Sequence, residues 1–171
     1  EAAAKACLNG AGPVDVGIVL GSGLAVLDDL EDRFDVPFSD IPGFPRPTVE
    51  GHQGVFSLGR VPGGQRVAIA RGRFHLYEGH TDRSATYVAR MIAALGAHTI
   101  VLTNAAGGLR EDWVPGDLML ISDHLNFTTK SVIMPREVPH GGILYDLELQ
   151  ALALGHSSRL GLALQRGCYV G

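Results

Sequence analysis

An arginine and a histidine, two side chains that bind oxyanions well, stand close together in RGRFHLYEGH, residues 71–80. Arg73 and His75 alternate with apolar residues, so in an extended chain they project to the same side. The guanidinium can donate two parallel hydrogen bonds to a phosphate group. The spacing therefore predicts an oxyanion site, with Tyr77 and Glu78 extending its polar edge; the alternative is a solvated strand end with a local ion pair.

Backbone N–H groups provide a second candidate anion site at GSG, residues 21–23. This turn follows the apolar run VGIVL and precedes LAVLDDL, residues 24–30, which we expect to form a helix. Its glycines let amide groups approach an anion, and the hydroxyl of Ser22 adds a donor. The third glycine of a dinucleotide fingerprint and the lysine of a P-loop are missing, so an ordinary strand-to-helix turn is the alternative.

Small residues form the third cluster, TNAAGG at 103–108, directly after the apolar run TIVL. Apart from Asn104 the cluster carries little side chain, so a group that fits there meets bare backbone. Such a turn either cradles a ligand or packs against a helix, and the sequence leaves both readings open.

The other reactive residue types form no recognised motif. The 7 histidines and 2 cysteines show no HExxH or CxxC spacing, which argues against a catalytic metal. Ser22 lacks the GxSxG elbow, and neither cysteine stands among basic residues, which argues against a covalent nucleophile. We expect reduced thiols at Cys7 and Cys168 and no metal or organic cofactor.

Each polar cluster follows an apolar run of strand-like composition. Several runs are continuously apolar, which is typical of strands covered on both faces. Strands are expected within 16–23, 54–61, 66–72, 99–108 and 117–124.

Helical periodicity lies between these runs. TDRSATYVARMIAALGA, residues 81–97, predicts a helix with Thr81 or Asp82 as its cap and Gly96 as its stop. A second helix is expected within 144–160 and a short one within 2–8. The expected apolar stripe of the first is Val88, Met91, Ile92 and Leu95, and that of the second is Leu147, Ala151, Leu154 and Ser158.

Strands that alternate with helices predict an α/β fold with a mixed, largely parallel β-sheet flanked by helices. The length of 171 residues and the 46% hydrophobic content suit a single domain over 1–171. Two long irregular loops are expected, at 41–52 and 127–143.

The overall charge also limits the partners. With 14 basic and 18 acidic residues the net charge is −4, which argues against a nucleic-acid surface. The sequence does not open on a basic-then-apolar leader pattern, so we expect no targeting leader, and it has no apolar run of the roughly 18 residues that span a bilayer. We therefore expect a cytoplasmic protein without membrane contact that binds small molecules.

Together, and in this order, the three clusters resemble the signatures of the trimeric purine nucleoside phosphorylases. The resemblance runs from about residue 14 to 126 and implies the three-layer nucleoside phosphorylase architecture, of which this chain is expected to be the N-terminal portion. The matching stretches are GSGL (21–24), FPRPTVEGHQG (44–54), GRFHLYEG (72–79), TNAAGGL (103–109) and PGDLMLISDHLN (115–126).

The resemblance implies phosphorolysis, in which inorganic phosphate cleaves a purine nucleoside into the free base and (deoxy)ribose 1-phosphate, as in purine salvage. Phosphate is then a co-substrate, no cofactor is needed, and the assembly is a homotrimer. By resemblance, catalysis involves Ser22, Arg73 and His75, and phosphate is bound by Ser22, His52, Arg73, His75 and the N–H of Ala105. The nucleoside is expected to contact Tyr77, Ala106 and Gly107, with Glu78 and Asn104 in support.

The chain departs from the family pattern in two places. The family's purine-reading glutamate and asparagine follow the point that matches GCYVG, residues 167–171, so we expect a truncated, C-terminally incomplete fold. The loop at 127–147 keeps Tyr145-Asp146, but no phenylalanine stands where the family donates an aromatic residue to the neighbouring subunit. Two alternatives stay open: a methylthioadenosine phosphorylase-like enzyme, and a non-catalytic phosphate-binding chain.

Overall fold

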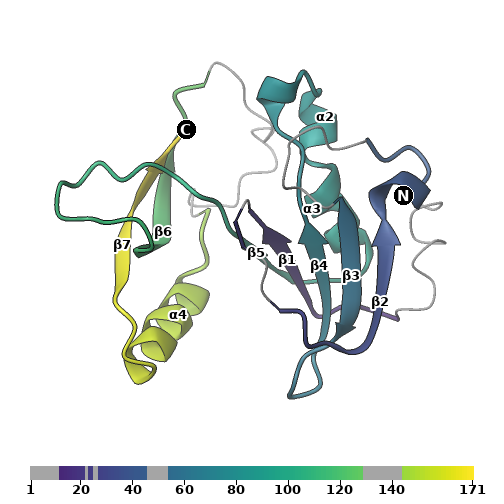
Figure 1. Cartoon of the computed structure of the whole chain (residues 1–171), viewed down its shortest axis with the longest axis horizontal. Coiled ribbons are helices and arrows are strands. Elements are labelled where there is room, and N and C mark those ends of the chain that lie inside the picture. The colour runs from purple at the N-terminus through teal and green to yellow at the C-terminus, as the bar shows by residue number, and fades with distance from the viewer. Residues whose placement is uncertain (1–11, 22, 25–26, 46–53, 129–143) are drawn as a thin grey trace. The chain divides into compact units, whose positions relative to one another are not determined.

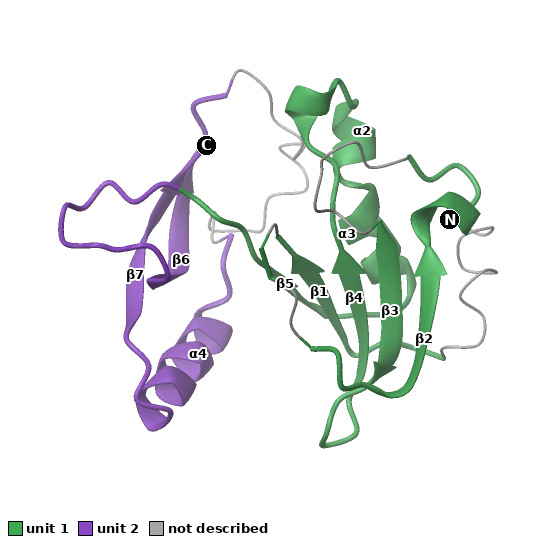
Figure 2. Ribbon diagram, in the orientation of Figure 1, with its two compact units in different colours: residues 1–106 green, residues 107–171 purple. Residues whose placement is uncertain are grey.

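The computed structural model describes residues 12–21, 23–24, 27–45, 54–128 and 144–171 (Figure 1). The chain divides into two compact units, residues 1–106 and residues 107–171 (Figure 2). Each unit is described by itself, and the single domain expected over 1–171 stays a prediction. None of the described helices combines the length and apolar character needed to cross a bilayer.

A five-stranded sheet with the order β2-β3-β4-β1-β5 forms the centre of the first unit. β1 pairs in parallel with both β4 and β5, whereas β3 runs antiparallel to β2 and β4. This arrangement confirms the α/β class and the mixed sheet. The strands are β1 (Val16–Leu20), β2 (Glu31–Pro37), β3 (Val55–Arg60), β4 (Arg66–Arg71) and β5 (Thr99–Leu102).

Four of these strands were expected from apolar runs, and β2 was not. EDRFDVP opens with three charged residues and alternates only from Phe34 onward, and most of its positions are exposed, so it gives no continuous apolar signal. The strands expected within 16–23 and 99–108 are also shorter than expected. They end at Leu20 and Leu102, before the small residues begin.

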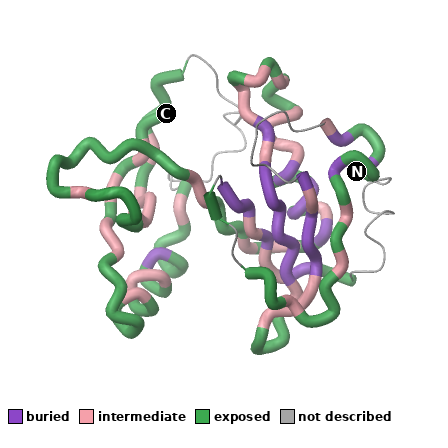
Figure 3. The backbone as a smooth tube through the Cα atoms, viewed as in Figure 1, coloured by how far each residue is buried: buried purple, intermediate pink, exposed green. Residues whose placement is uncertain are grey.

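Both faces of the central strands are covered, as their apolar composition predicts. On β4, Ala68 and Ala70 belong to the larger core cluster, while Val67 and Ile69 belong to a smaller cluster on the opposite face. Figure 3 shows the buried positions concentrated on the central strands.

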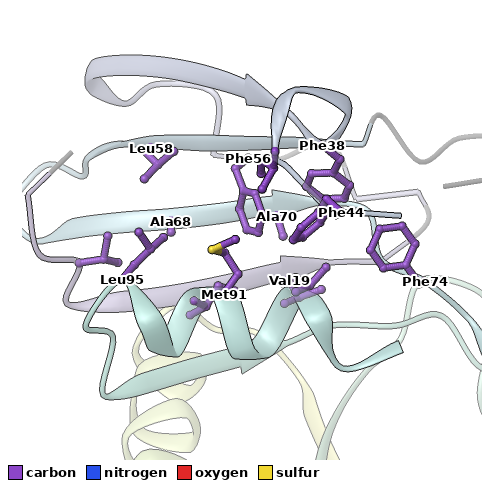
Figure 4. Packing of buried hydrophobic residues seen from close by; sticks show 14 residues of the cluster. Val19, Phe38, Phe44, Phe56, Leu58, Ala68, Ala70, Phe74, Met91 and Leu95 are labelled. Atoms are coloured by element: carbon purple, nitrogen blue, oxygen red, sulfur yellow. The ribbon is translucent and has the colours of Figure 1, made fainter. Parts of the chain in front are cut away.

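Aromatic rings and one helix complete the larger cluster. Phe38 lies at the centre of the rings, with centroids 4.8 Å from Phe44, 5.0 Å from Phe56 and 5.8 Å from Phe74. Phe38 opens the short 3₁₀ helix η1 (Phe38–Asp40). In Figure 4, Met91 points from its helix toward the sheet.

The helix expected over 81–97 is present as two pieces, α2 (Asp82–Ala85) and α3 (Tyr87–Ala94). Thr86 separates them because its hydroxyl donates to the main-chain carbonyls of Asp82 and Arg83. The cap at Thr81 is confirmed, since its hydroxyl accepts the N–H of Ser84. The predicted stripe is confirmed as well: Val88, Met91, Ile92 and Leu95 are all buried.

The helix expected over 24–30 is wrong for its described residues. Leu24 and residues 27–30 are not helical, and Leu27 has a φ of 63°, which an α-helix excludes. A helix N-terminus therefore does not contribute its partial positive charge here. The short helix expected within 2–8 lies outside the described residues.

In the second unit, β6 (Leu118–Leu125) and β7 (Leu164–Val170) pair in parallel, and α4 (Leu147–Arg159) packs on both. α4 lies within the expected range 144–160, and it begins at Leu147 because the carboxylate of Asp146 accepts the N–H of Leu149. Its predicted stripe is wrong except at one position. The more covered residues of α4 are Gln150, Ala153, Leu154 and Ser157.

Tyr145, which precedes this cap, contacts β6. Its hydroxyl lies 3.2 Å from Nδ1 of His124, and burial raises the pKa of the Tyr145 phenol, with the nearby carboxylate of Asp123 adding to the effect. Tyr145-Asp146 thus has a structural role in this unit, where Tyr145 contacts β6 and Asp146 starts α4.

Candidate active site

The carboxyl ends of β1, β4 and β5 lie at one edge of the sheet because these three strands are parallel. Gly21 follows β1, Gly72 and Arg73 follow β4, and Thr103 and Asn104 follow β5. Ligands of open α/β sheets collect at such an edge. The topology therefore brings the three polar clusters of the sequence together.

Thr103 joins the ends of β1 and β5 through one hydroxyl. Its Oγ1 donates to the carbonyl of Val19 at 3.0 Å and accepts the N–H of Gly21 at 2.9 Å. The main-chain N–H of Thr103 donates to the same Val19 carbonyl at 3.0 Å. The glycine turn is consequently fixed to the strand beside it, and this role of Thr103 was not predicted from the sequence.

Arg73 brings the third strand end into this arrangement. Its Nη1 donates to the main-chain carbonyl of Thr103 at 3.0 Å, with the guanidinium half-buried. A Cβ atom at Gly21 would lie 2.8 Å from the Thr103 carbonyl oxygen, 2.9 Å from Cα of Asn104 and 3.1 Å from Nη1 of Arg73. Only a glycine fits at position 21, because any side chain would overlap backbone atoms.

In the sequence, Phe74 separates His75 from Arg73, and Phe74 is buried in the core. The backbone of His75 is extended, as the alternation predicts, but the alternation ends there because Leu76 opens the 3₁₀ helix η2 (Leu76–Glu78). The exposed Tyr77 ring stacks on the His75 imidazole, with the centroids 4.7 Å apart and the planes 16° apart. The aromatic face of Tyr77 therefore orients the imidazole.

A buried carboxylate fixes the turn that carries His75. Oε1 of Glu78 accepts the main-chain N–H of His75 at 2.7 Å, and Oε2 lies 3.6 Å from Nε2 of His80. The Glu78 side chain is only 3% exposed. These contacts place the Glu78 carboxylate on the backbone of His75, and its supporting role stays a prediction.

Of the other expected site residues, the structure describes some and not others. Ser22 and His52 lie outside the described residues. Asn104 donates from Nδ2 to the carbonyl of Ala105 at 3.3 Å, and Ala105 and Ala106 are exposed at the end of the first unit. Gly107 opens the second unit.

No group of three or more His, Cys, Asp or Glu side chains that could hold a metal ion occurs within the described ranges. The donors gathered at the sheet edge are instead a guanidinium, an imidazole and backbone amides. Donors of these types favour an oxyanion over a cation.

Known proteins resemble the chain over nearly its whole length. The family model described as the phosphorylase superfamily matches residues 15–171. Purine nucleoside phosphorylase 1 of Geobacillus stearothermophilus is 41% identical over 163 residues, which are 91% of this chain and 59% of the relative. Purine nucleoside phosphorylase of Mycobacterium leprae is 48% identical over 122 residues, 70% of this chain and 45% of that protein.

Solved structures show the same likeness. A purine nucleoside phosphorylase in complex with ribose-1-phosphate has a TM-score of 0.86 and 30% identity, covering 98% of this chain and 67% of that one. Schistosoma mansoni purine nucleoside phosphorylase in complex with inosine has a TM-score of 0.84 and 28% identity, covering 99% and 64%. The chain thus spans about three fifths of the length of the first curated relatives that it matches, at 59%.

Proposed function

Because the chain belongs to the phosphorylase superfamily, we propose that it acts in phosphorolysis of purine (deoxy)ribonucleosides. Inorganic phosphate attacks the anomeric carbon of the sugar, a C–O bond forms, and the bond to the purine nitrogen breaks. The electron pair of that bond leaves with the base, which takes up a proton. The products are the free purine and (deoxy)ribose 1-phosphate.

The observation that carries this proposal is the convergence of Gly21, Arg73 and Thr103 at the carboxyl edge of the sheet. Phosphate needs several fixed donors, and its negative charge stabilises the oxocarbenium-like sugar that forms as the base departs. A phosphate held in line beneath the sugar also gains from proximity.

We further propose the residue roles that the resemblance to the purine nucleoside phosphorylases implies. Arg73, His75, Ser22, His52 and the N–H of Ala105 bind phosphate, and the first three of these also act in catalysis. Tyr77 contacts the ribose, while Ala106 and Gly107 line the base pocket. Glu78 and Asn104 hold the two turns that present these groups.

The broader setting is part of the same proposal. We propose a role in purine salvage in the cytoplasm, with inorganic phosphate as co-substrate and no cofactor; the relatives named purine nucleoside phosphorylase support the reaction class. We also infer that residues 1–171 belong to one phosphorylase domain and that the chain assembles as a homotrimer.

The test is release of hypoxanthine from inosine by the purified chain, with and without inorganic phosphate, followed by chromatography of base and sugar phosphate. Phosphate-dependent formation of hypoxanthine and ribose 1-phosphate supports the proposal. Phosphate binding without turnover of any nucleoside would instead support the non-catalytic alternative. Turnover that does not depend on phosphate would contradict phosphorolysis.

A further inference from the structure

A second arginine lies in the core two residues before Arg73. Arg71, the last residue of β4, is 5% exposed, and its Nε donates to the hydroxyl of Ser57 at 2.8 Å. Its Nη2 donates to the carbonyl of Leu27 at 3.1 Å and lies 2.9 Å from Oδ1 of Asp28. A buried guanidinium is tolerated only when it is paired in this way, so these contacts are needed for the fold to accept it.

The partners of Arg71 are themselves connected. Arg33 contacts Oδ1 of Asp28 at 3.3 Å and Oδ2 of Asp35 at 2.9 Å, and Asp35 is hydrogen-bonded to Ser57. The Arg71 network, defined as Arg71, Ser57, Asp35, Arg33 and Asp28, is therefore a closed ring. It joins β4, β3 and β2 to the segment that follows the glycine turn of β1.

The Arg71 network contacts backbone at Leu27, which belongs to no helix or strand. Leu27 has a φ of 63°, a left-handed conformation that leucine rarely adopts, and Arg71 binds its carbonyl. The carbonyl of Arg71 in turn accepts the N–H of Gly54 at 2.9 Å. One residue thus anchors two segments, which begin five residues after Ser22 and two residues after His52 in the sequence.

We propose that Arg71 is a positioning residue for phosphate binding, acting through Leu27 and Asp28 on the segment that continues the glycine turn. This inference rests on the proposed function. Arg73 presents donors to the phosphate, whereas Arg71 holds the Leu27 carbonyl and the Asp28 carboxylate of the segment after the glycine turn. Lysine cannot replace it, because one ammonium group does not reproduce the planar fork that reaches three acceptors.

The test compares Arg71→Lys and Asp28→Asn with two matched controls. Arg60 and Asp32 form a surface ion pair, and β-sheet register places Arg60 at the end of β3 opposite to Val55, which is the partner of Arg71. Arg60→Lys and Asp32→Asn therefore make the same chemical changes far from the glycine turn. Asp28 is 59% exposed, so its variant keeps the test valid if Arg71→Lys fails to fold.

Two readouts are measured: affinity for inorganic phosphate by ³¹P NMR titration, and hydrogen exchange of the Leu24 amide, which donates to the carbonyl of Gly21. We expect both test variants to bind phosphate roughly three- to tenfold more weakly and to exchange the Leu24 amide faster, with the controls unchanged. A structural role alone would lower the melting temperature of the test variants without a selective loss of phosphate binding.

The outcomes separate the two proposals. If wild type binds phosphate and both test variants bind it equally well, the positioning role is overturned and the proposed function stands. Unchanged Leu24 exchange in both variants also overturns the positioning role, whatever happens to phosphate. A wild-type chain that binds no phosphate overturns the proposed function and the role of Arg71 together.

Discussion

At the scale of single residues, loss of the Arg73 side chain should have the most specific effect on phosphate binding. Arg73→Ala removes a charged donor from the sheet edge and is expected to weaken phosphate binding by about 1.5–3 kcal/mol, the range for a hydrogen bond to a charged group. Isothermal titration calorimetry with inorganic phosphate measures this change, with Arg60→Ala as the control. An unchanged affinity would remove Arg73 from the phosphate site.

Thr103 gives a prediction about stability. Thr103→Val keeps the shape of the side chain but removes the hydroxyl that accepts the Gly21 N–H and donates to the Val19 carbonyl. We expect the free energy of unfolding to fall by about 1–3 kcal/mol, because the amide is left unsatisfied. Thr103→Ser retains the hydroxyl and should lose clearly less in urea unfolding; equal losses for both variants would argue against the hydrogen bonds as the cause.

At the scale of elements, β1 and α3 are in close contact at Gly17. A Cβ atom there would lie 2.0 Å from Cγ2 of Ile92, a stiff and buried side chain. Gly17→Ala should therefore destabilise the first unit by about 1–3 kcal/mol through overpacking.

The matched control is Gly155→Ala in α4, where nothing lies within 4 Å of an added Cβ. Removing a helical glycine should raise stability by roughly 0.4–1 kcal/mol. Opposite signs for the two substitutions in thermal unfolding are the expected result. Destabilisation by both substitutions to the same extent would argue against the contact with Ile92 as the cause of the effect at Gly17.

The stability that the pairing of β2 with β3 contributes should depend on pH. The hydrogen bond from Arg33 holds the pKa of Asp35 below its usual range, so folding favours the carboxylate. That stabilisation is complete above the unfolded pKa of about 3.9 and is lost as the pH falls through the lower folded value. Urea midpoints measured from about pH 5 to about pH 2 should fall, and the fall should be smaller in Asp35→Asn; equal slopes would contradict this.

Local sequence patterns predicted most helices and strands of this chain. The predictions that failed involve contacts between residues that are far apart in the sequence. The apolar runs and the cap at Thr81 are local signals, so α3 and all the strands of the central sheet except β2 were found. The helix expected over 24–30 failed because Arg71, far away in the sequence, takes the Leu27 carbonyl. Arg73 and Glu78 were recognisable by residue type, whereas the bridging hydroxyl of Thr103 becomes visible only when β5 lies beside β1.

At the scale of the whole molecule, large apolar side chains remain exposed in both units. Val101 and Leu102 are 45% and 61% exposed, and Leu118, Leu152 and Leu162 are 53%, 54% and 51% exposed. Exposed apolar surface of this kind marks contact with other chains or segments. The chain should therefore sediment as an assembly, with three copies as the expected form, in analytical ultracentrifugation. A single monomeric species at all concentrations would contradict the proposed homotrimer.

The two outer strands of the five-stranded sheet differ in a way that limits how the sheet can be extended. β2 carries Glu31, Asp32 and Asp35 and ends in Pro37, features that discourage pairing with another strand. β5, the other outer strand of the described sheet, carries no charge and is largely exposed. A further strand, whether from the same chain or from another copy, can therefore be added at β5 but not at β2, so the sheet can be extended at one edge only.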